Sequence, residues 1–272
     1  MIKRHLFQFF SIILFLLFAG CISTCADGSI TLNPSECPSQ PPSITIANWN
    51  VQILGDSKEA KPELMAFYAD TIKKYDIVFI QEIRDADGSV FPALCSRIPE
   101  YNCNISSRAG RSSSKEQIGI IYRKDITLLS LRDFNPDSMN RWERPPVMAE
   151  FDADGYHLSI YNIHTKPTDV PSELGALESI ALAPGNAIVL GDLNADCAYY
   201  SPKEHIHFLS WKWIIPDNAD TTVHATDCAY DRIIMNPKSF AEFLNYGIYT
   251  EGINSSVSDH YLVWVNITTQ EN

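Results

Sequence analysis

Residues 77–82 read IVFIQE and residues 187–194 read AIVLGDLN, and these two stretches decide the fold. Each is a continuous apolar run of strand length that ends in acidic or amide side chains. In layered α/β sheets, ligand sites gather beyond one end of the strands. We therefore expect an α/β protein whose polar residues converge on one pocket at that edge.

The same alternation of strand-like and helix-like segments continues through the rest of the chain. Apolar residues at helical spacing predict helices over 62–74 and 174–182. Further strands are predicted at 43–49, 118–122, 147–151, 158–163, 232–235 and 261–267. One domain over residues 43–272 accounts for this pattern, because no second linker and no internal repeat interrupt it. Residues 22–42, rich in Ser, Pro and Thr, are expected to be a linker.

The composition limits the classes of function. The 272 residues are 45% apolar and 20% charged, which is ordinary for a globular protein and excludes disorder and a multi-span membrane protein. The formal net charge is −12. A protein that holds nucleic acid by bulk positive potential would be basic. Any polyanionic substrate must therefore be met by a local basic patch or by metal ions.

The N-terminus has the pattern of an export signal. Lys3 and Arg4 precede an almost wholly apolar run over 6–20, which is typical of a secretory signal peptide and short for a membrane-spanning helix. We expect residues 1–21 to be this signal and the protein to be secreted. Without Lys3 and Arg4 the mature chain has 19 cationic and 33 acidic side chains, a charge of −14.

An alternative is a lipoprotein attached to a membrane surface, because residues 19–21, AGC, resemble the end of a bacterial lipoprotein signal. Export permits disulfides, and the cysteine count differs between the two cases. Ordinary cleavage after Ala26 leaves five cysteines. A lipid on Cys21 leaves an even set of six: Cys25, Cys37, Cys95, Cys103, Cys197 and Cys228.

Polar side chains stand at the boundary of six apolar runs. Singly, each is a common turn former, helix cap or structural hydrogen bonder. Together they supply carboxylate and amide oxygens, which suit Mg²⁺, Mn²⁺ or Ca²⁺, and two histidines that could act as base and acid in phosphoester hydrolysis. No zinc-type Cys/His spacing, nucleophile elbow or Walker loop is present. The residues are Asn50, Gln81, Glu82, His164, Asp192, Asn194, Asp231, Asp259 and His260.

Seven segments carry a resemblance to a known family: NWNVQ (48–52), YDIVFIQEIRD (75–85), GRSSSKEQIG (110–119), YNIHTKP (161–167), VLGDLNADC (189–197), IPDNADTTVHATDCAYDRI (215–233) and SDHYLV (258–263). They resemble the endonuclease/exonuclease/phosphatase superfamily, specifically its deoxyribonuclease I branch. The resemblance implies a four-layer αββα sandwich with two mixed sheets packed face to face. It also implies a divalent-metal-dependent endonuclease that hydrolyses DNA with little sequence specificity.

The resemblance assigns roles to individual residues. His164 would pair with Glu116 and His260 with Asp231, and which pair is base and which is acid stays open. Asp192 and Asn194 would complete the catalytic site around the phosphate. The ligands of Mg²⁺ or Mn²⁺ would be Glu82, Asn50 and Asp259. A structural Ca²⁺ loop would contain Asp220, Thr222 and Thr226, and Cys197 would form a disulfide with Cys228.

The resemblance also implies how DNA is held, with Arg84 in the minor groove and Arg111 and Arg144 near phosphates. The chain departs from the family pattern at Gln52, where the family has Arg, and at Ser114, where it has Tyr. Both changes should weaken the grip on the duplex. We expect a monomer that acts mainly on double-stranded DNA and needs no protein partner.

Two alternative functions remain at this point. One is another phosphodiesterase of the superfamily, acting on apurinic DNA, sphingomyelin or inositol phosphates, which the CAYDRI and NADC strings and the arginines at 84 and 144 disfavour. The other is a catalytically silent binding module. The intact set of histidines and acids disfavours that alternative, because a decayed copy would be expected to lose some of them.

Overall fold

The structure is a computed structural model, and it describes residues 23–24, 30–31, 42–112, 114–201 and 206–270. Contacts divide the chain into two units, residues 1–41 and 42–272. In the first, the described residues form a short antiparallel pair, β1 (Ser23–Thr24) and β2 (Ile30–Thr31). The predicted signal segment, Cys21, Cys25 and Cys37 lie outside the described residues. Within those residues, no helix is long and apolar enough to cross a membrane.

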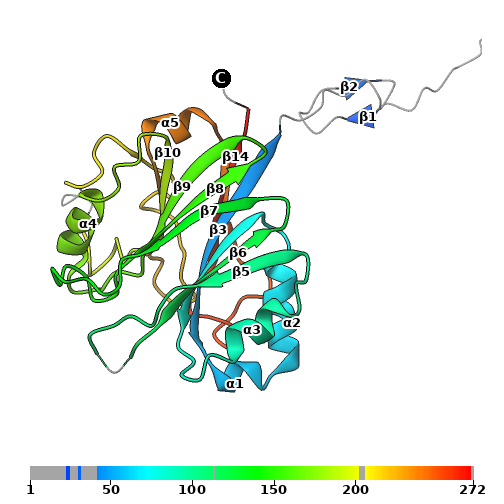
Figure 1. Cartoon of the computed structure of the whole chain (residues 1–272), viewed down its shortest axis with the longest axis vertical. Helices are drawn as coiled ribbons and strands as arrows, with labels where there is room; N and C mark the ends of the chain where they lie inside the picture. Colours follow the sequence, from blue (N-terminus) through cyan, green and yellow to red (C-terminus); the bar gives the residue numbers. More distant parts are fainter. Residues whose placement is uncertain (1–22, 25–29, 32–41, 113, 202–205, 271–272) are drawn as a thin grey trace, which may run out of the picture. The chain divides into compact units, whose positions relative to one another are not determined.

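The second unit contains two six-stranded sheets (Figure 1). One sheet has the order β13 (Phe243–Tyr249), β14 (Leu262–Thr268), β3 (Ser43–Leu54), β4 (Ile77–Ile83), β6 (Gln117–Arg123) and β5 (Tyr101–Ile105). The other has the order β11 (Lys212–Trp213), β12 (Asp231–Met235), β10 (Asn186–Asp192), β9 (Tyr156–Asn162), β8 (Val147–Ala153) and β7 (Thr127–Asp133). Both sheets are mixed, because β3 runs parallel to β4, and β9 to β10, while the other pairs are antiparallel.

The two sheets bury a common apolar core between them. Ile46 and Phe79 of one sheet and Ile160 and Leu190 of the other belong to this core, and each is fully buried. Because side chains alternate across a strand, the neighbouring residues face outward into two further apolar clusters beneath helices. The shared core therefore holds the sheets together, and the outer clusters attach the helical layers.

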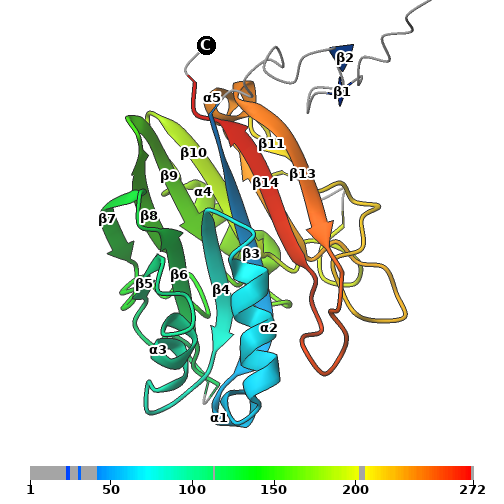
Figure 2. The ribbon, with the colours of Figure 1, turned by 90° about the vertical axis from the view of Figure 1, so that its right-hand side faces the viewer.

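Helices cover the outer face of each sheet (Figure 2). Tyr68 of α2 packs with Trp49 and Val78 on the first sheet, and Leu174 of α4 packs with Val189 on the second. The helices are α1 (Asp56–Glu59), α2 (Pro62–Ile72), α3 (Val90–Cys95), α4 (Val170–Glu178) and α5 (Pro237–Ala241). This is the αββα sandwich expected from the resemblance.

The structure confirms every predicted strand and helix, with shifted ends. The largest shift is in β3, which ends at Leu54, five residues beyond the predicted 49. Both ends of α4 lie four residues before the predicted 174 and 182, because Asp169 and Pro171 start the helix. In the second unit the strands that were not predicted, β5, β7, β11 and β13, are the four edges of the two sheets, and the short pair of β1 and β2 was not predicted either. Edge strands are partly exposed and carry mixed residues, so their apolar pattern is weak.

Two disulfides lie among the described residues. Cys197 pairs with Cys228, as the resemblance implied, and ties the loop after β10 to the loop before β12. Cys95 pairs with Cys103 and joins the end of α3 to β5.

Candidate active site

The sheet topology brings the predicted residues to one edge. Asn50 lies beside Gln81 in the parallel register of β3 and β4, so Asn50 and Glu82 lie at the same edge of the sheet. In the second sheet Asp192 at the end of β10 is paired with Asp231 at the start of β12. Strand ends from both sheets therefore deliver the site residues to the same region.

A buried amide network joins the two sheets under the site. Gln81 Nε2 donates to Asn162 Oδ1 at 3.0 Å and to the Ile163 carbonyl at 2.8 Å, and Gln81 Oε1 accepts from the Asp192 amide at 2.9 Å. A Cβ at Gly191 would lie 2.0 Å from the Ile163 carbonyl oxygen, so only glycine permits this approach. Asn162 was missed as a site residue; its signal is an amide placed inside an apolar run.

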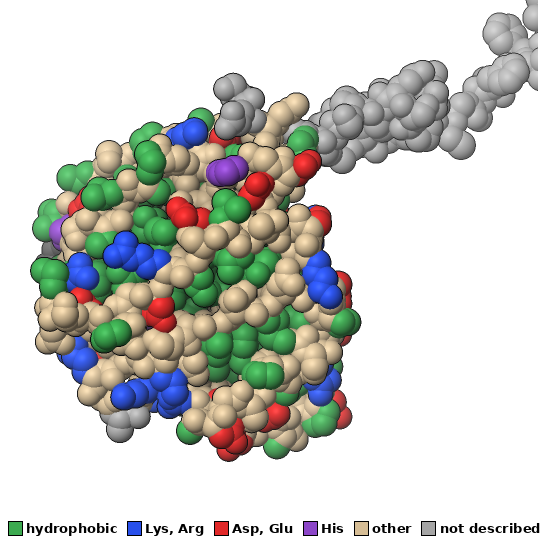
Figure 3. Space-filling view, in the orientation of Figure 1, with side chains coloured by type: hydrophobic (Ala, Val, Ile, Leu, Met, Phe, Trp, Pro, Cys, Tyr) green, Lys and Arg blue, Asp and Glu red, His purple; other side chains and the backbone are tan. Residues whose placement is uncertain are grey.

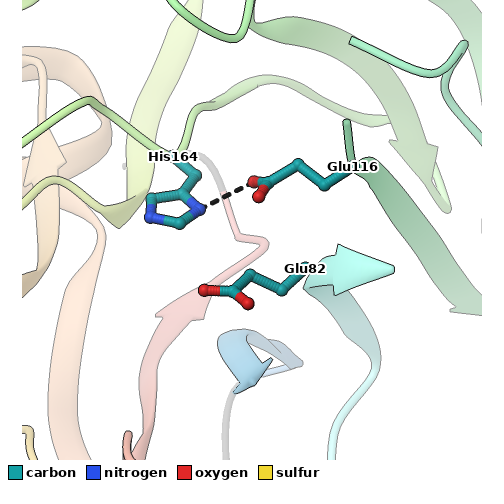
Figure 4. Close-up of side chains that lie close together, drawn as sticks. All are labelled: Glu82, Glu116 and His164. Carbon is teal, nitrogen blue, oxygen red and sulfur yellow. Dashed lines mark hydrogen bonds and ion pairs between the residues drawn. The ribbon is translucent and has the colours of Figure 1, made fainter. Parts of the chain in front are cut away.

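The first histidine–carboxylate pair is formed as expected. His164 Nδ1 lies 2.7 Å from Glu116 Oε1, and both side chains are buried. Figure 4 shows the Glu116 carboxylate directed at the ring, with Glu82 nearby. Arg144 lies 3.5 Å from Glu116 and donates to the carbonyls of His164 and Thr165. Arg144 therefore fixes the backbone of His164 as well as adding positive charge.

The second pair has the same form. His260 Nδ1 lies 2.7 Å from Asp231 Oδ2, and Asp231 is fully buried. The Ser258 hydroxyl accepts from the His260 amide at 3.0 Å, and Trp49 Nε1 donates to the His260 carbonyl at 3.0 Å. Each carboxylate therefore holds Nδ1 of its imidazole, which leaves Nε2 directed at the site.

Asp192 links the two pairs. Its Oδ2 lies 3.3 Å from His164 Nε2 and 3.5 Å from His260 Nε2, and accepts from Asn50 Nδ2 at 3.1 Å. Asp192 Oδ1 accepts from the Asn194 amide, while Asn194 Nδ2 donates to the Thr165 carbonyl. Both reactive imidazole nitrogens thus face a single carboxylate oxygen.

The carboxylates and imidazoles of this site stabilise each other's charged forms. Burial alone would lower the pKa of both histidines, but Glu116 raises the pKa of His164, and Asp231 and Asp192 raise that of His260. Burial would likewise raise the pKa of Asp192, but the two histidines lower it. The arrangement therefore favours charged imidazolium–carboxylate pairs while no cation is bound.

Asn50, Glu82 and Asp259 add further oxygen atoms around the two pairs, with Glu82 close to Glu116 and His164. Asn50 Nδ2 donates to Glu82 Oε1 at 3.2 Å, and Glu82 Oε2 accepts from the Ile53 amide at 3.0 Å. Asn50 Oδ1 accepts from the Gln52 amide. Among the described side chains, Asp259 Oδ1, like Asp231 Oδ1, is buried without a hydrogen-bond partner, but it lies 3.9 Å from His260 Nε2. Glu82 offers a carboxylate oxygen within 4.8 Å of ligand atoms of Glu116 and His164, and carboxylate oxygens grouped in this way fit a hard divalent cation.

Two site residues have strained backbones. Glu82 has a φ of +61° and Asn194 a φ of +47°, values that non-glycine residues rarely adopt. Such conformations persist only where the surrounding structure imposes them, and they cluster at functional sites. The regular pairing of β3 with β4 is interrupted between Asn50 and Leu54, and this irregularity turns the Glu82 side chain toward the site.

The predicted arginines take different positions. Arg84 Nη1 lies 3.8 Å from Glu82 Oε2, and Arg144 is at the first pair as described. Arg111 instead donates through its guanidinium to the Trp142 and Asn140 carbonyls. Gln52 is half-buried and Ser114 is exposed.

The predicted Ca²⁺ residues lie together in the loop before β12. Asp220 Oδ1 accepts from the Thr222 amide and hydroxyl, and the Thr222 hydroxyl lies 3.3 Å from the Thr226 carbonyl. The next residue, Val223, donates its amide to the Asp259 carbonyl at 2.8 Å. This loop therefore adjoins the segment that carries Asp259 and His260.

The chain matches known proteins over most of its length. The sequence pattern of the endonuclease/exonuclease/phosphatase family matches residues 47–260. Deoxyribonuclease-1 of Gallus gallus is 31% identical over 261 residues, which cover 82% of this chain and 92% of that protein. Deoxyribonuclease-1 of Bos taurus is 29% identical and covers 83% and 93%.

Solved structures show the same fold. A family protein from Bacteroides thetaiotaomicron superposes with a TM-score of 0.64 at 18% identity, covering 84% of this chain and 98% of that one. A mannosyl-6-phosphatase of the same organism, Bt3783, gives a TM-score of 0.61 at 16% identity, covering 82% and 98%.

Proposed function

Because the chain belongs to the endonuclease/exonuclease/phosphatase family, as a deoxyribonuclease I-like member, we propose that it is a divalent-metal-dependent endonuclease that hydrolyses DNA with little sequence specificity. The chain is a nuclease, a phosphodiester hydrolase. The proposal adds the metal, the duplex substrate and the residues that act on it.

One observation carries the proposal. Two histidines, each held by its own carboxylate, direct Nε2 at the same oxygen of Asp192. Hydrolysis of a phosphodiester needs a proton taken from the attacking water and a proton given to the leaving oxygen. Two imidazoles around one small volume can do both.

In this mechanism the two pairs act on opposite sides of one phosphate. The imidazole that is neutral accepts a proton from water at Nε2, and the one that is charged donates a proton from Nε2 to the departing 3′ oxygen. Glu116 and Asp231 hold the tautomers and stabilise the charged rings. Asp192 and Asn194 orient the rings and the phosphate, and we assign the roles of the two pairs jointly.

The metal would be Mg²⁺ or Mn²⁺, held by Glu82 and Asp259 with Asn50 beside them. When bound, it supplies positive charge that stabilises the phosphate as negative charge develops in the transition state. Two observations support this assignment: Glu82 is grouped with Glu116 and His164, and Asp259 Oδ1 is buried without a hydrogen bond. We further propose Ca²⁺ for the loop of Asp220, Thr222 and Thr226, where it would brace the neighbouring Asp259 segment.

The substrate would be held by few contacts. The chain has a net charge of −12, and the face shown in Figure 3 carries separate groups of Lys and Arg among Asp and Glu, with no continuous basic surface. Binding must then rest on short-range cations, of which Arg84 and Arg144 lie at the site and Arg111 supports a nearby loop. We propose that the protein acts as a monomer.

The proposed location is extracellular. Two disulfides favour an oxidising compartment, in agreement with the signal predicted at residues 1–21. Plain secretion and a lipid anchor on Cys21 both satisfy these observations.

Removal of the metal tests the function. Purified protein should nick supercoiled plasmid in Mg²⁺ or Mn²⁺ and lose all nicking above background in a chelator, because the phosphate charge is then unopposed. Added Mg²⁺ should restore the rate. Full nicking in chelator would contradict the proposed mechanism, and cleavage confined to apurinic plasmid, or hydrolysis of sphingomyelin or inositol phosphates instead of DNA, would favour the alternatives.

Arg84→Ala should raise KM for duplex DNA about tenfold, the scale of one lost charge-assisted hydrogen bond, and leave kcat within about twofold. It should also reduce the salt slope of binding by about one. Kinetics over a salt series measure both. Arg97→Ala, which removes an exposed arginine at the end of α3, is the charge-matched control.

The same series tests the two departures from the family. The double variant Gln52→Arg with Ser114→Tyr should lower KM by restoring two contacts to the duplex. An unchanged KM in Arg84→Ala would show that the duplex is held by another surface.

A further inference from the structure

A lysine outside the proposed catalytic and ligand set connects the segment that carries Asn50 with the segment that carries Asp259 and His260. Lys58, on α1, donates from Nζ to the Val51 carbonyl at 2.5 Å and to the Val257 carbonyl at 2.7 Å. Val51 follows Asn50 within β3, and Val257 lies two residues before Asp259 and three before His260. One ammonium group thus bridges the backbone of two segments that carry site residues.

The bridge lies beyond the end of the ladder between β3 and β14. The antiparallel register of β3 and β14 stops at the pair of Asn48 and Val263. Beyond it, Trp49 Nε1 bonds the His260 carbonyl and the Ser258 hydroxyl bonds the Asn50 carbonyl at 2.7 Å. Hydrogen bonds from side chains therefore join β3 to residues 257–260 beyond the end of the ladder. Lys58 makes one of these links.

The ammonium is also held close to the carboxylates of the site. Lys58 is half-buried, and burial lowers its pKa to about 8, while Asp259 and Glu82 oppose that shift. A lysine kept there for its charge alone would repel a cation bound by those carboxylates. The ammonium is instead held by two hydrogen bonds to backbone carbonyls, so its role is to fix the distance between the two segments.

We propose that Lys58 is a positioning residue that sets the separation of the Asn50 and Glu82 side of the site from the Asp259 and His260 side, and so determines both metal affinity and turnover. The inference rests on the proposed function. Misplacement of reacting groups by about 1 Å can cost on the order of a hundredfold in rate, so loss of this bridge should be measurable without loss of the fold.

The test compares Lys58→Met with Tyr68→Phe. The Tyr68 hydroxyl donates to the same Val257 carbonyl at 2.6 Å. Tyr68 contacts β3 through its ring, which packs against Trp49, and Tyr68→Phe retains that contact. Tyr68→Phe therefore removes one bond to that carbonyl and keeps the bridge, whereas Lys58→Met removes the bridge. Lys58→Arg keeps a charged donor that can reach two carbonyls.

Calorimetric titration with Mg²⁺, steady-state nicking and thermal unfolding give the readouts. Lys58→Met should weaken Mg²⁺ binding about three- to tenfold and lower kcat about tenfold, with KM for DNA nearly unchanged. Lys58→Arg should recover most of both losses. Tyr68→Phe should stay within about twofold of the parent protein in Mg²⁺ affinity and kcat.

Three results would overturn the inference: Mg²⁺ affinity and kcat unchanged in Lys58→Met, tighter Mg²⁺ binding with unchanged kcat, or an equal loss in Tyr68→Phe. Tighter binding would show that the ammonium acts only through its charge. If Lys58→Met does not fold, Lys58→Gln, which keeps one donor group, is judged by the same criteria. Failure of the parent protein to nick DNA would contradict the proposed function, while the Mg²⁺ titrations would still test Lys58.

Discussion

His164→Ala and His260→Ala should each lower the nicking rate at least about a hundredfold, the scale expected for removal of a general acid or base. The expectation follows from the two pairs, because each ring is held at Nδ1 by a buried carboxylate and presents Nε2 at the site. Single-turnover nicking of supercoiled plasmid in Mg²⁺ measures the loss.

The control for these variants is His157→Ala. His157 lies on β9 with its side chain 68% exposed and a carboxylate, Asp152, 3.6 Å away. It is therefore a histidine–acid pair outside the site, and its removal should leave nicking unchanged. Near-normal nicking by folded His164→Ala or His260→Ala would disprove the role of that histidine.

Asp192→Asn should lower the rate by at least about a thousandfold, because one substitution disturbs both histidines. It removes the charge that stabilises the two imidazolium rings and replaces one of the two oxygen atoms that accept from Asn50 Nδ2 and the Asn194 amide. The shape of the side chain is retained, so the fold should persist. Nicking kinetics and thermal unfolding separate the two effects.

Asp76→Asn is the matched control for Asp192→Asn. Asp76 accepts hydrogen bonds from the amide and hydroxyl of Thr45 just before β4, at the opposite end of that strand from Glu82. Like Asp192, Asp76 accepts hydrogen bonds within the fold, but it lies away from the site. Its variant should therefore nick at the parental rate. Parental nicking by Asp192→Asn would mean that the imidazoles work independently of it.

The sequence predicted the layers of the fold because the central strands are apolar throughout. Residues 77–80 and 187–190 are fully buried or nearly so, as their pattern indicated. The edge strands were missed because their faces are partly exposed. β13, for example, places Leu244 and Tyr246 in solvent and includes an asparagine and a glycine.

The site was predictable in part for a physical reason. Residues that perform proton transfer and bind cations are polar, and here they interrupt apolar runs, so Glu82 and Asp192 are visible in the sequence. The pairing of His164 with Glu116 joins residues 48 positions apart, and only the resemblance supplied it. Lys58 gives no sequence signal, because its role depends on two backbone carbonyls that the fold brings to it.

The most direct test of the account is a double-variant cycle on the two histidines, measured as single-turnover nicking of supercoiled plasmid in saturating Mg²⁺. If both pairs act on one phosphate around Asp192, either single substitution abolishes the concerted proton transfers. The double variant His164→Ala with His260→Ala should then be at most a few-fold slower than the slower single variant. A double variant slowed by the full product of the two single losses would contradict this account, because it would show that the two histidines contribute independently.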